Sequence, residues 1–251
     1  PTRPAAAPVP TTVTPMDAVP AATEPPPSTA PVPVAVARAV HNHQHLMCMD
    51  EPLSALDAPR RAAILPYLER VAAETQVPIL YVTHDVSEAA RLSDAMIVMD
   101  QGQIVGEGPV AHMLARGDMA PYLGVRGAGG MIETRVGDTV DGLTQLQFAG
   151  GMLWLANVDH PKGSTLRLRI AAQDVILAKT APLGLSALNV LPAQITEIVT
   201  DTKGAHVALA IGQAQLLARV TSQSVDRLSL KQGQTIHAII KATAVDPAAQ
   251  G

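Results

Sequence analysis

Two acidic residues at the end of a short apolar run are the first candidates for chemistry in this sequence. Residues 46–49 (LMCM) are apolar, and Asp50 and Glu51 follow them directly. A continuous apolar run of this length, bounded by polar residues, favours a buried parallel strand. Phosphoryl transfer requires rigid positioning and charge neutralisation more than covalent chemistry. Asp50 is therefore a candidate Mg²⁺ ligand, and Glu51 is a candidate catalytic residue that polarises an attacking water.

A second apolar run ends on a residue suited to the same chemistry. Residues 79–83 (ILYVT) favour another buried strand, and His84 follows at its tip, where it could contact a terminal phosphate. Between the two strands, Asp57 precedes Ala58-Pro59, which is a typical helix start with the aspartate as N-cap. The predicted helix runs to about Glu74, with a kink at Pro66.

The segments DEPLSALD (50–57) and THD (83–85), in this order and spacing, resemble the nucleotide-binding domains of ATP-binding cassette (ABC) transporters. The resemblance implies an α/β fold with ATP and Mg²⁺ as ligands. It makes Asp50 and Glu51 the end of the Walker B strand and His84 the contact to the γ-phosphate. Ser54 and Asp57 then belong to a nucleotide-site loop that meets a second copy of the subunit.

Two glycine-containing motifs of that family are absent from this sequence. No glycine precedes Gly102, and no Gly-Lys dipeptide occurs anywhere. Glycine is needed in a phosphate loop because the backbone must wrap the phosphates at φ values that other residues resist. The resemblance begins near Val34, without the Walker A loop or the signature motif. We therefore expect an incomplete chain that neither binds ATP tightly nor hydrolyses it by itself.

The texture of the sequence predicts four segments. Residues 1–33 hold more than half of the 21 prolines and are expected to be disordered. Residues 34–123 alternate strand and helix patterns, which predicts a parallel sheet with covering helices, as a partial ABC domain would have. Residues 124–184 begin with a glycine-rich stretch and are expected to be a linker with accessory strands. Residues 185–246 predict an all-β small barrel of the OB-like type.

The last segment carries a second resemblance. The stretches LSALNVLPAQITEI, ARVTSQSVDRLSLKQGQ and IIKATAV resemble the molybdate-binding domain shared by molybdate-importer ATPases and small molybdate-binding proteins. The resemblance implies oxyanion contacts from Ser186, Thr221, Lys241 and Ala242, at an interface between two copies. Leu188 stands where that family has arginine, so one charged contact is missing.

Composition limits the remaining possibilities. The 251 residues carry a formal net charge of -4, which argues against a nucleic-acid partner. A single cysteine, Cys48, fits a reducing cytoplasm. The resemblances imply an ATPase subunit of a molybdate importer, on the inner face of the membrane, with a second copy and a membrane permease as partners. The alternatives are a non-catalytic protein that binds molybdate or tungstate, and a remnant of an importer for another solute.

Overall fold

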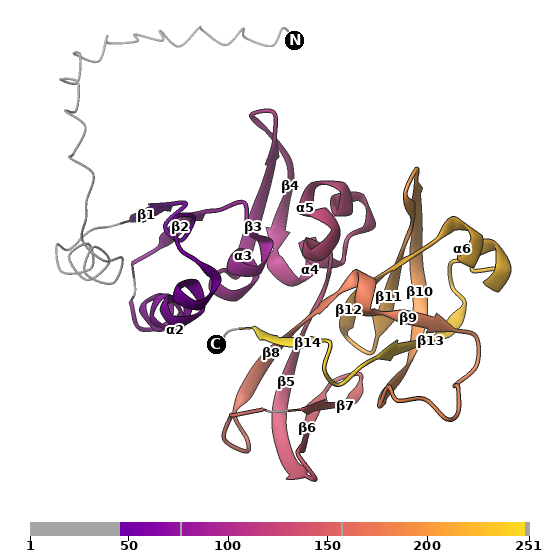
Figure 1. Cartoon of the computed structure of the whole chain (residues 1–251). Coiled ribbons are helices and arrows are strands. Elements are labelled where there is room, and N and C mark those ends of the chain that lie inside the picture. Colours follow the sequence, from indigo (N-terminus) through magenta and orange to yellow (C-terminus); the bar gives the residue numbers. More distant parts are fainter. Residues whose placement is uncertain (1–45, 76, 157, 249–251) are drawn as a thin grey trace, which may run out of the picture.

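The computed structural model describes residues 46–75, 77–156 and 158–248 (Figure 1). The proline-rich segment 1–33 and the predicted start of the ABC resemblance near Val34 lie outside these residues. The front part contains nine helices and strands in the described residues. They are β1 (Met47–Asp50), α2 (Ala58–Glu74), β2 (Ile79–Val82), α3 (Val86–Leu92), β3 (Ala95–Asp100), β4 (Gln103–Pro109), α4 (Val110–Ala115), η1 (Gly117–Met119) and α5 (Ala120–Gly127).

Strands β1 and β2 form a parallel pair, as the apolar runs predict. Helix α2 begins as expected, because the Asp57 side chain accepts a hydrogen bond from the Arg60 N–H. The helix continues through Pro66, whose missing N–H removes one intrahelical hydrogen bond. It buries Leu65 and Leu68 against the sheet and so covers one face of the β1–β2 pair.

The third strand of the predicted parallel sheet pairs differently. Strand β3 is antiparallel to β4 and forms a separate two-stranded sheet. The cause is the turn between them, where Gln101 and Gly102 both have left-handed backbones, with φ of 47° and 77°. Two consecutive residues of this conformation form the turn that best suits a β-hairpin. The expectation of one parallel sheet through 34–123 is therefore not met in the described residues.

The back part is almost entirely β-structure, as predicted. Its elements are β5 (Gly129–Val140), β6 (Leu143–Phe148), β7 (Gly151–Ala156), β8 (Thr165–Ala171), η2 (Ala172–Asp174), β9 (Ile176–Ala178), β10 (Asn189–Asp201), β11 (Gly204–Ile211), β12 (Ala214–Val220), α6 (Ser222–Leu228), β13 (Thr235–Ile240) and β14 (Val245–Ala248). They form two five-stranded sheets with the strand orders β14-β8-β5-β6-β7 and β12-β11-β10-β13-β9.

These two sheets are built from a repeated unit that exchanges its last strand. The unit β5–β9 and the unit β10–β14 have the same pairing pattern, and each long first strand carries one register shift, after Val136 and after Ile195. Strand β9 leaves its own unit and pairs with β13, whereas β14 pairs with β8. Residues 129–178 thus form half of a joint structure, beyond the accessory role expected from the sequence. Both sheets contribute to one apolar core, which includes Leu146, Leu168 and Leu209.

The glycine-rich stretch predicted to be a linker is part of the folded structure. Helix α5 occupies it up to Gly127, with a kink at Gly124, and β5 begins at Gly129. A Cβ atom on Gly129 would lie 2.0 Å from the Ile170 carbonyl oxygen, and one on Gly130 would lie 2.4 Å from Leu216 Cδ2. These glycines permit close packing, whereas the sequence pattern was interpreted as flexibility.

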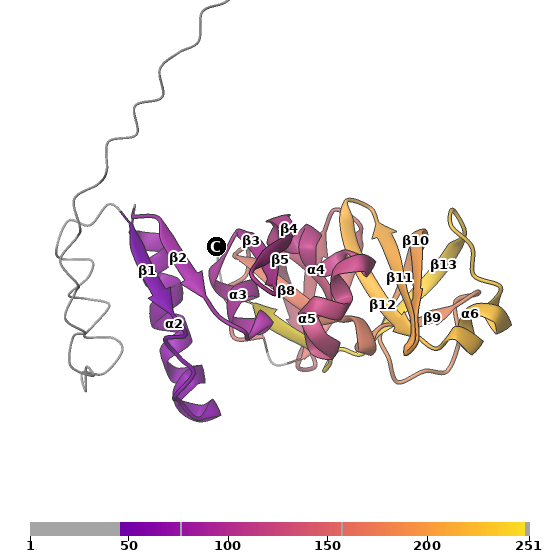
Figure 2. The same ribbon diagram turned by 90° about the horizontal axis from the view of Figure 1, so that it is seen from above.

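The front and back parts share a second apolar cluster. Met113 and Leu114 of α4 and Leu123 of α5 pack with Ala172 of η2 and Leu217 of β12. Seen from above, β1, β2 and α2 lie at one end of the molecule, and β10, β13 and α6 lie at the other (Figure 2). Helices α4 and α5 lie between them. Within the described residues, no helix combines the length and the apolar character that crossing a membrane requires.

Candidate functional site

The structure brings Glu51 and His84 together. Asp50 at the end of β1 is paired with Val82 at the end of β2, so the residues that follow both strands meet at one sheet edge. One carboxylate oxygen of Glu51, Oε1, accepts the backbone N–H of His84 at 2.9 Å and lies 2.7 Å from His84 Nδ1. The hydrogen bond to Glu51, supported by its negative charge, raises the pKa of His84 above 6.5. Glu51 itself has a left-handed backbone, with φ of 46°.

The loop after β1 carries the other residues assigned to the nucleotide site. Asp50 is exposed. The Ser54 hydroxyl donates to the Glu51 carbonyl oxygen at 2.8 Å and so closes the turn. Asp57 is exposed at the start of α2, where it accepts the Arg60 N–H. In the described chain both Ser54 and Asp57 shape the loop, and their expected contacts with a second copy stay a prediction.

A buried charge network below this loop pair was not found from the sequence. Glu88 in α3 is 4% exposed and accepts hydrogen bonds from Tyr81 and Thr83, both at 2.9 Å. Burial and the hydrogen bond to Glu88 raise the pKa of Tyr81. Arg61 in α2 forms ion pairs with Glu88 and Asp85. Tyr81 and Thr83 alternate with outward residues along β2, and this period-two pattern was the available signal.

The residues assigned to oxyanion binding fall into two groups. Lys241 and Ala242 directly follow β13, whose last residue, Ile240, pairs with Asn189. Ser186 precedes Asn189 and is exposed, so it lies at the same end of β10. Thr221 follows β12 next to the β10–β11 turn and caps α6. Within one chain, Thr221 is therefore at the opposite end of β10 from Ser186 and Lys241.

Asn189 has a structural role that the motif match did not predict. Its side chain is buried, accepts the Trp154 N–H at 2.6 Å and donates to the Trp154 carbonyl oxygen at 3.0 Å. It therefore joins β10 to β7 of the other unit, in the manner of a strand pair. In the repeated unit, Gly130 takes the equivalent pairing position opposite Ile170, and Ala171 stands where Lys241 stands. The cation of the candidate oxyanion site thus occurs in the second unit alone.

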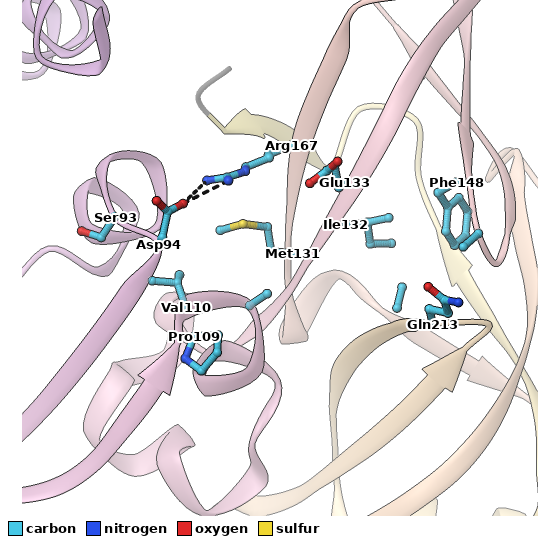
Figure 3. A pocket seen from close by; sticks show the side chains of 13 residues that line it. Ser93, Asp94, Pro109, Val110, Met131, Ile132, Glu133, Phe148, Arg167 and Gln213 are labelled. Atoms are coloured by element: carbon cyan, nitrogen blue, oxygen red, sulfur yellow. Dashed lines mark hydrogen bonds and ion pairs between the residues drawn. The ribbon is translucent and has the colours of Figure 1, made fainter. Parts of the chain in front are cut away.

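A cavity of about 530 Å³ lies where the front and back parts meet (Figure 3). Met131, Ile132 and Phe148 line it together with polar residues from both parts. At one side, both terminal nitrogens of Arg167 lie 3.0 Å from one carboxylate oxygen of Asp94. This ion pair connects β8 to the segment between α3 and β3. Among the described residues, no group of three or more histidine, cysteine, aspartate or glutamate side chains could hold a metal ion.

Comparison with known families gives a match at the C-terminal end. The TOBE domain family matches residues 185–247. This range covers the second β unit, including strands β10 to β14, and contains all four residues assigned to the oxyanion.

Curated relatives cover most of the chain. It is 40% identical over 215 residues to the molybdenum import ATP-binding protein ModC of Albidiferax ferrireducens, which covers 84% of this chain and 58% of that protein. It is 41% identical over 216 residues to ModC of Rhizobium meliloti, covering 85% of this chain and 60% of the relative. The chain thus spans somewhat less than two thirds of the length of these relatives.

Solved structures also align with the back part. A molybdate-bound form of the cytoplasmic molybdate-binding protein ModG covers 48% of this chain and 95% of its own, with 24% identity and a TM-score of 0.43. A molybdate-binding protein from Sporomusa ovata covers 24% of this chain and 90% of its own, with 33% identity and a TM-score of 0.23.

Proposed function

We propose that this chain, a homologue of the molybdenum import ATP-binding proteins, is part of the ATP-binding subunit of a molybdate importer. The observation that carries the proposal is 40% identity over 215 residues, which runs through both the front and the back part. The convergence of Glu51 and His84 at one sheet edge supports it independently, because the relatives' name implies a nucleotide site. In this role the front part is a partial ABC domain.

The chemistry of that site would be phosphoryl transfer to water. Glu51 would orient the water, and His84, held on the same carboxylate oxygen, would contact the γ-phosphate. Mg²⁺ bound with ATP supplies charge neutralisation of the phosphates. Magnesium keeps most of its waters and phosphate ligands and needs only one or two protein carboxylates, so the exposed Asp50 is a suitable donor.

The partners would be a second copy of the subunit and a membrane permease, at the cytoplasmic face of the membrane. Ser54 and Asp57 are exposed at the loop that would face the second copy. In the oxyanion site, Lys241 would supply the charge, while the Ser186 and Thr221 hydroxyls and the Ala242 amide would supply directed hydrogen bonds. Because Thr221 lies at the far end of β10, one complete site would combine Ser186 and Lys241 of one copy with Thr221 of another.

Nucleotide titration tests the first half of the proposal. Backbone donors and a loop lysine normally hold the phosphates, and this sequence contains neither a Gly-Lys dipeptide nor any glycine before Gly102. We expect calorimetry with Mg-ATP to detect no tight binding and a phosphate-release assay to detect no turnover. ATPase activity that disappears in Glu51→Gln would contradict this expectation and assign catalysis to the chain itself.

Oxyanion titration tests the second half. We expect the full chain to bind molybdate and tungstate but not sulfate. Because Leu188 replaces an arginine, one charge-assisted contact is missing, which weakens binding by roughly 1.5–3 kcal/mol, or about one to two decades. Leu188→Arg should therefore tighten molybdate binding, whereas Leu188→Gln, the uncharged control, should not. A folded chain that binds no oxyanion in any form would refute the assignment of Ser186 and Lys241.

A second candidate function is a non-catalytic molybdate- or tungstate-binding protein. It is favoured by one contrast in the described residues: the back part completes both of its sheets, while the front part has two pairs of strands. Molybdate binding without any response to ATP, in the presence of the permease, would favour this candidate.

A further inference from the structure

Below the Glu51–His84 contact lies a buried carboxylate that the proposed chemistry does not use. Glu88 is 4% exposed, and its Oε2 accepts hydrogen bonds from the hydroxyls of Tyr81 and Thr83. Its other oxygen, Oε1, lies 3.5 Å from Arg61 Nη1. A buried carboxylate is stable only if it is hydrogen-bonded and paired with a cation. Arg61 is therefore held in place by the charge of Glu88.

From this position Arg61 reaches both functional loops. Its Nη1 donates to Asp85 Oδ2 at 2.9 Å, directly after His84. Its Nη2 donates to the Leu56 carbonyl oxygen at 3.5 Å, in the loop after β1. A planar guanidinium with donors in a fixed geometry is suited to connect several acceptors at once. One side chain of α2 thus links the loop that follows β1 to the loop that follows β2.

The residues on either side of His84 are fixed by this network. The Thr83 hydroxyl donates to Glu88 and accepts the Asp85 N–H at 3.0 Å. Asp85 in turn caps α3 by accepting the Ser87 N–H at 2.8 Å. With both neighbours held, the backbone of His84 has little freedom to rotate. Its N–H and its Nδ1 consequently reach the same oxygen of Glu51.

We propose that Arg61 is a positioning residue, which holds His84 against Glu51 through its contacts with Glu88, Asp85 and Leu56. The proposal rests on the nucleotide-site assignment of Glu51 and His84 for its functional meaning. The geometry itself can be measured without nucleotide, so the two can fail separately.

The test is an NMR titration of the full chain with labelled histidines. The signal of His84 is identified among the eight histidines by its loss in His84→Gln. Glu51→Gln provides the reference, because it removes the contact that raises the pKa of His84. In Arg61→Met we expect the pKa of His84 to fall toward this reference, and the His84 amide to exchange faster with solvent. Loss of a nearby cation alone would act in the opposite direction and raise that pKa.

Three controls sharpen the result. Arg60→Met removes the neighbouring exposed arginine, whose carboxylate contact is 3.8 Å from Asp57, and should leave His84 unchanged. Arg61→Met placed on Glu51→Gln should no longer lower the pKa of His84, because the effect acts through Glu51. Arg61→Lys keeps the charge but cannot connect three acceptors, so it should lower the pKa part of the way.

The outcomes separate the possibilities. An unchanged or raised pKa of His84 in folded Arg61→Met overturns the positioning role. If Arg61→Met loses helical signal, Arg61→Lys decides, and an unchanged pKa there overturns the proposal as well. If the His84 responses occur as expected but nucleotide never binds in any complete assembly, the positioning holds while the assigned function fails.

Discussion

The front and back parts of this chain solve the problem of open sheet edges in different ways. The front part has two sheets of two strands each, and side chains on their outer faces are exposed, including Leu46 (54%), Leu80 (49%), Ile97 (56%) and Met99 (63%). The back part has two sheets of five strands around one apolar core, and each repeated unit completes the sheet of the other. An isolated pair of strands is marginal in water, whereas larger sheets with a shared core are stable. The stability of the chain should therefore be distributed unevenly.

The largest expected effect is in the core of the back part. Leu209 is 1% exposed in the cluster that joins both sheets, and Leu65 is 7% exposed in the small cluster under β1. We expect Leu209→Ala to lower the free energy of unfolding of the back part by about 3–5 kcal/mol, because well-packed sites cannot collapse around the cavity. Leu65→Ala should affect only the opening of the front part. Hydrogen exchange of peptides from 58–74 and 204–211 separates the two, and equal effects on both would contradict the comparison.

Asn189 should give the next largest effect, because it joins the two units. Asn189→Ala leaves the N–H and carbonyl of Trp154 without partners at a buried position, which should cost about 2–4 kcal/mol in urea unfolding. Gln194→Ala is the matched control, since its side chain is exposed and makes one bond of 3.3 Å. A change of similar size in the control would remove Asn189 as a specific connection between the units.

A small effect is expected at the joint between the two parts. The Asp94 side chain is 87% exposed in its ion pair with Arg167, so the pair should contribute less than about 1 kcal/mol. Asp94→Asn should leave the unfolding of the back part unchanged and modestly increase the opening of α3, measured by hydrogen exchange. The effect should decrease with salt. An effect that resists salt would indicate that the joint is stronger than its exposure implies.

The smallest effect concerns pH, and its sign should differ between the parts. Burial lowers the pKa of His206 in the back part below 6.5, and this outweighs the opposing charge of Asp201, 4.0 Å away. The unfolded chain therefore binds more protons between the two pKa values, and stability falls as the pH decreases below 6.5. For His84 the folded pKa is raised, so its contribution is present below 6.5 and is lost as the pH rises through the folded pKa. Hydrogen exchange across this range, compared with His206→Asn and His84→Asn, checks both signs.

Local pattern was a good guide to elements and a poor guide to their partners. The helix at Ser222–Leu228 and the strands β1, β2 and β12 follow from periodicity and capping. The exchange of β9 and β14 could not be predicted, because a strand's sequence does not specify which of two similar edges it joins. The convergence of Glu51 and His84 followed from two parallel strands that end at one edge. The burial of Glu88 was missed because its compensating groups, Arg61 and Tyr81, come from other elements.

The exchange of last strands also has a consequence for biosynthesis. Strand β8, at residues 165–171, has no partner on one side until residues 245–248 have left the ribosome and folded back as β14. The first unit therefore cannot finish its sheet co-translationally, although all of its own residues are already available. Pairing across such a sequence separation raises the contact order, which slows folding and prolongs the exposure of a bare strand edge. The interval between synthesis of β8 and of β14 is thus the period in which a nascent chain of this protein is most open to pairing with the wrong strand.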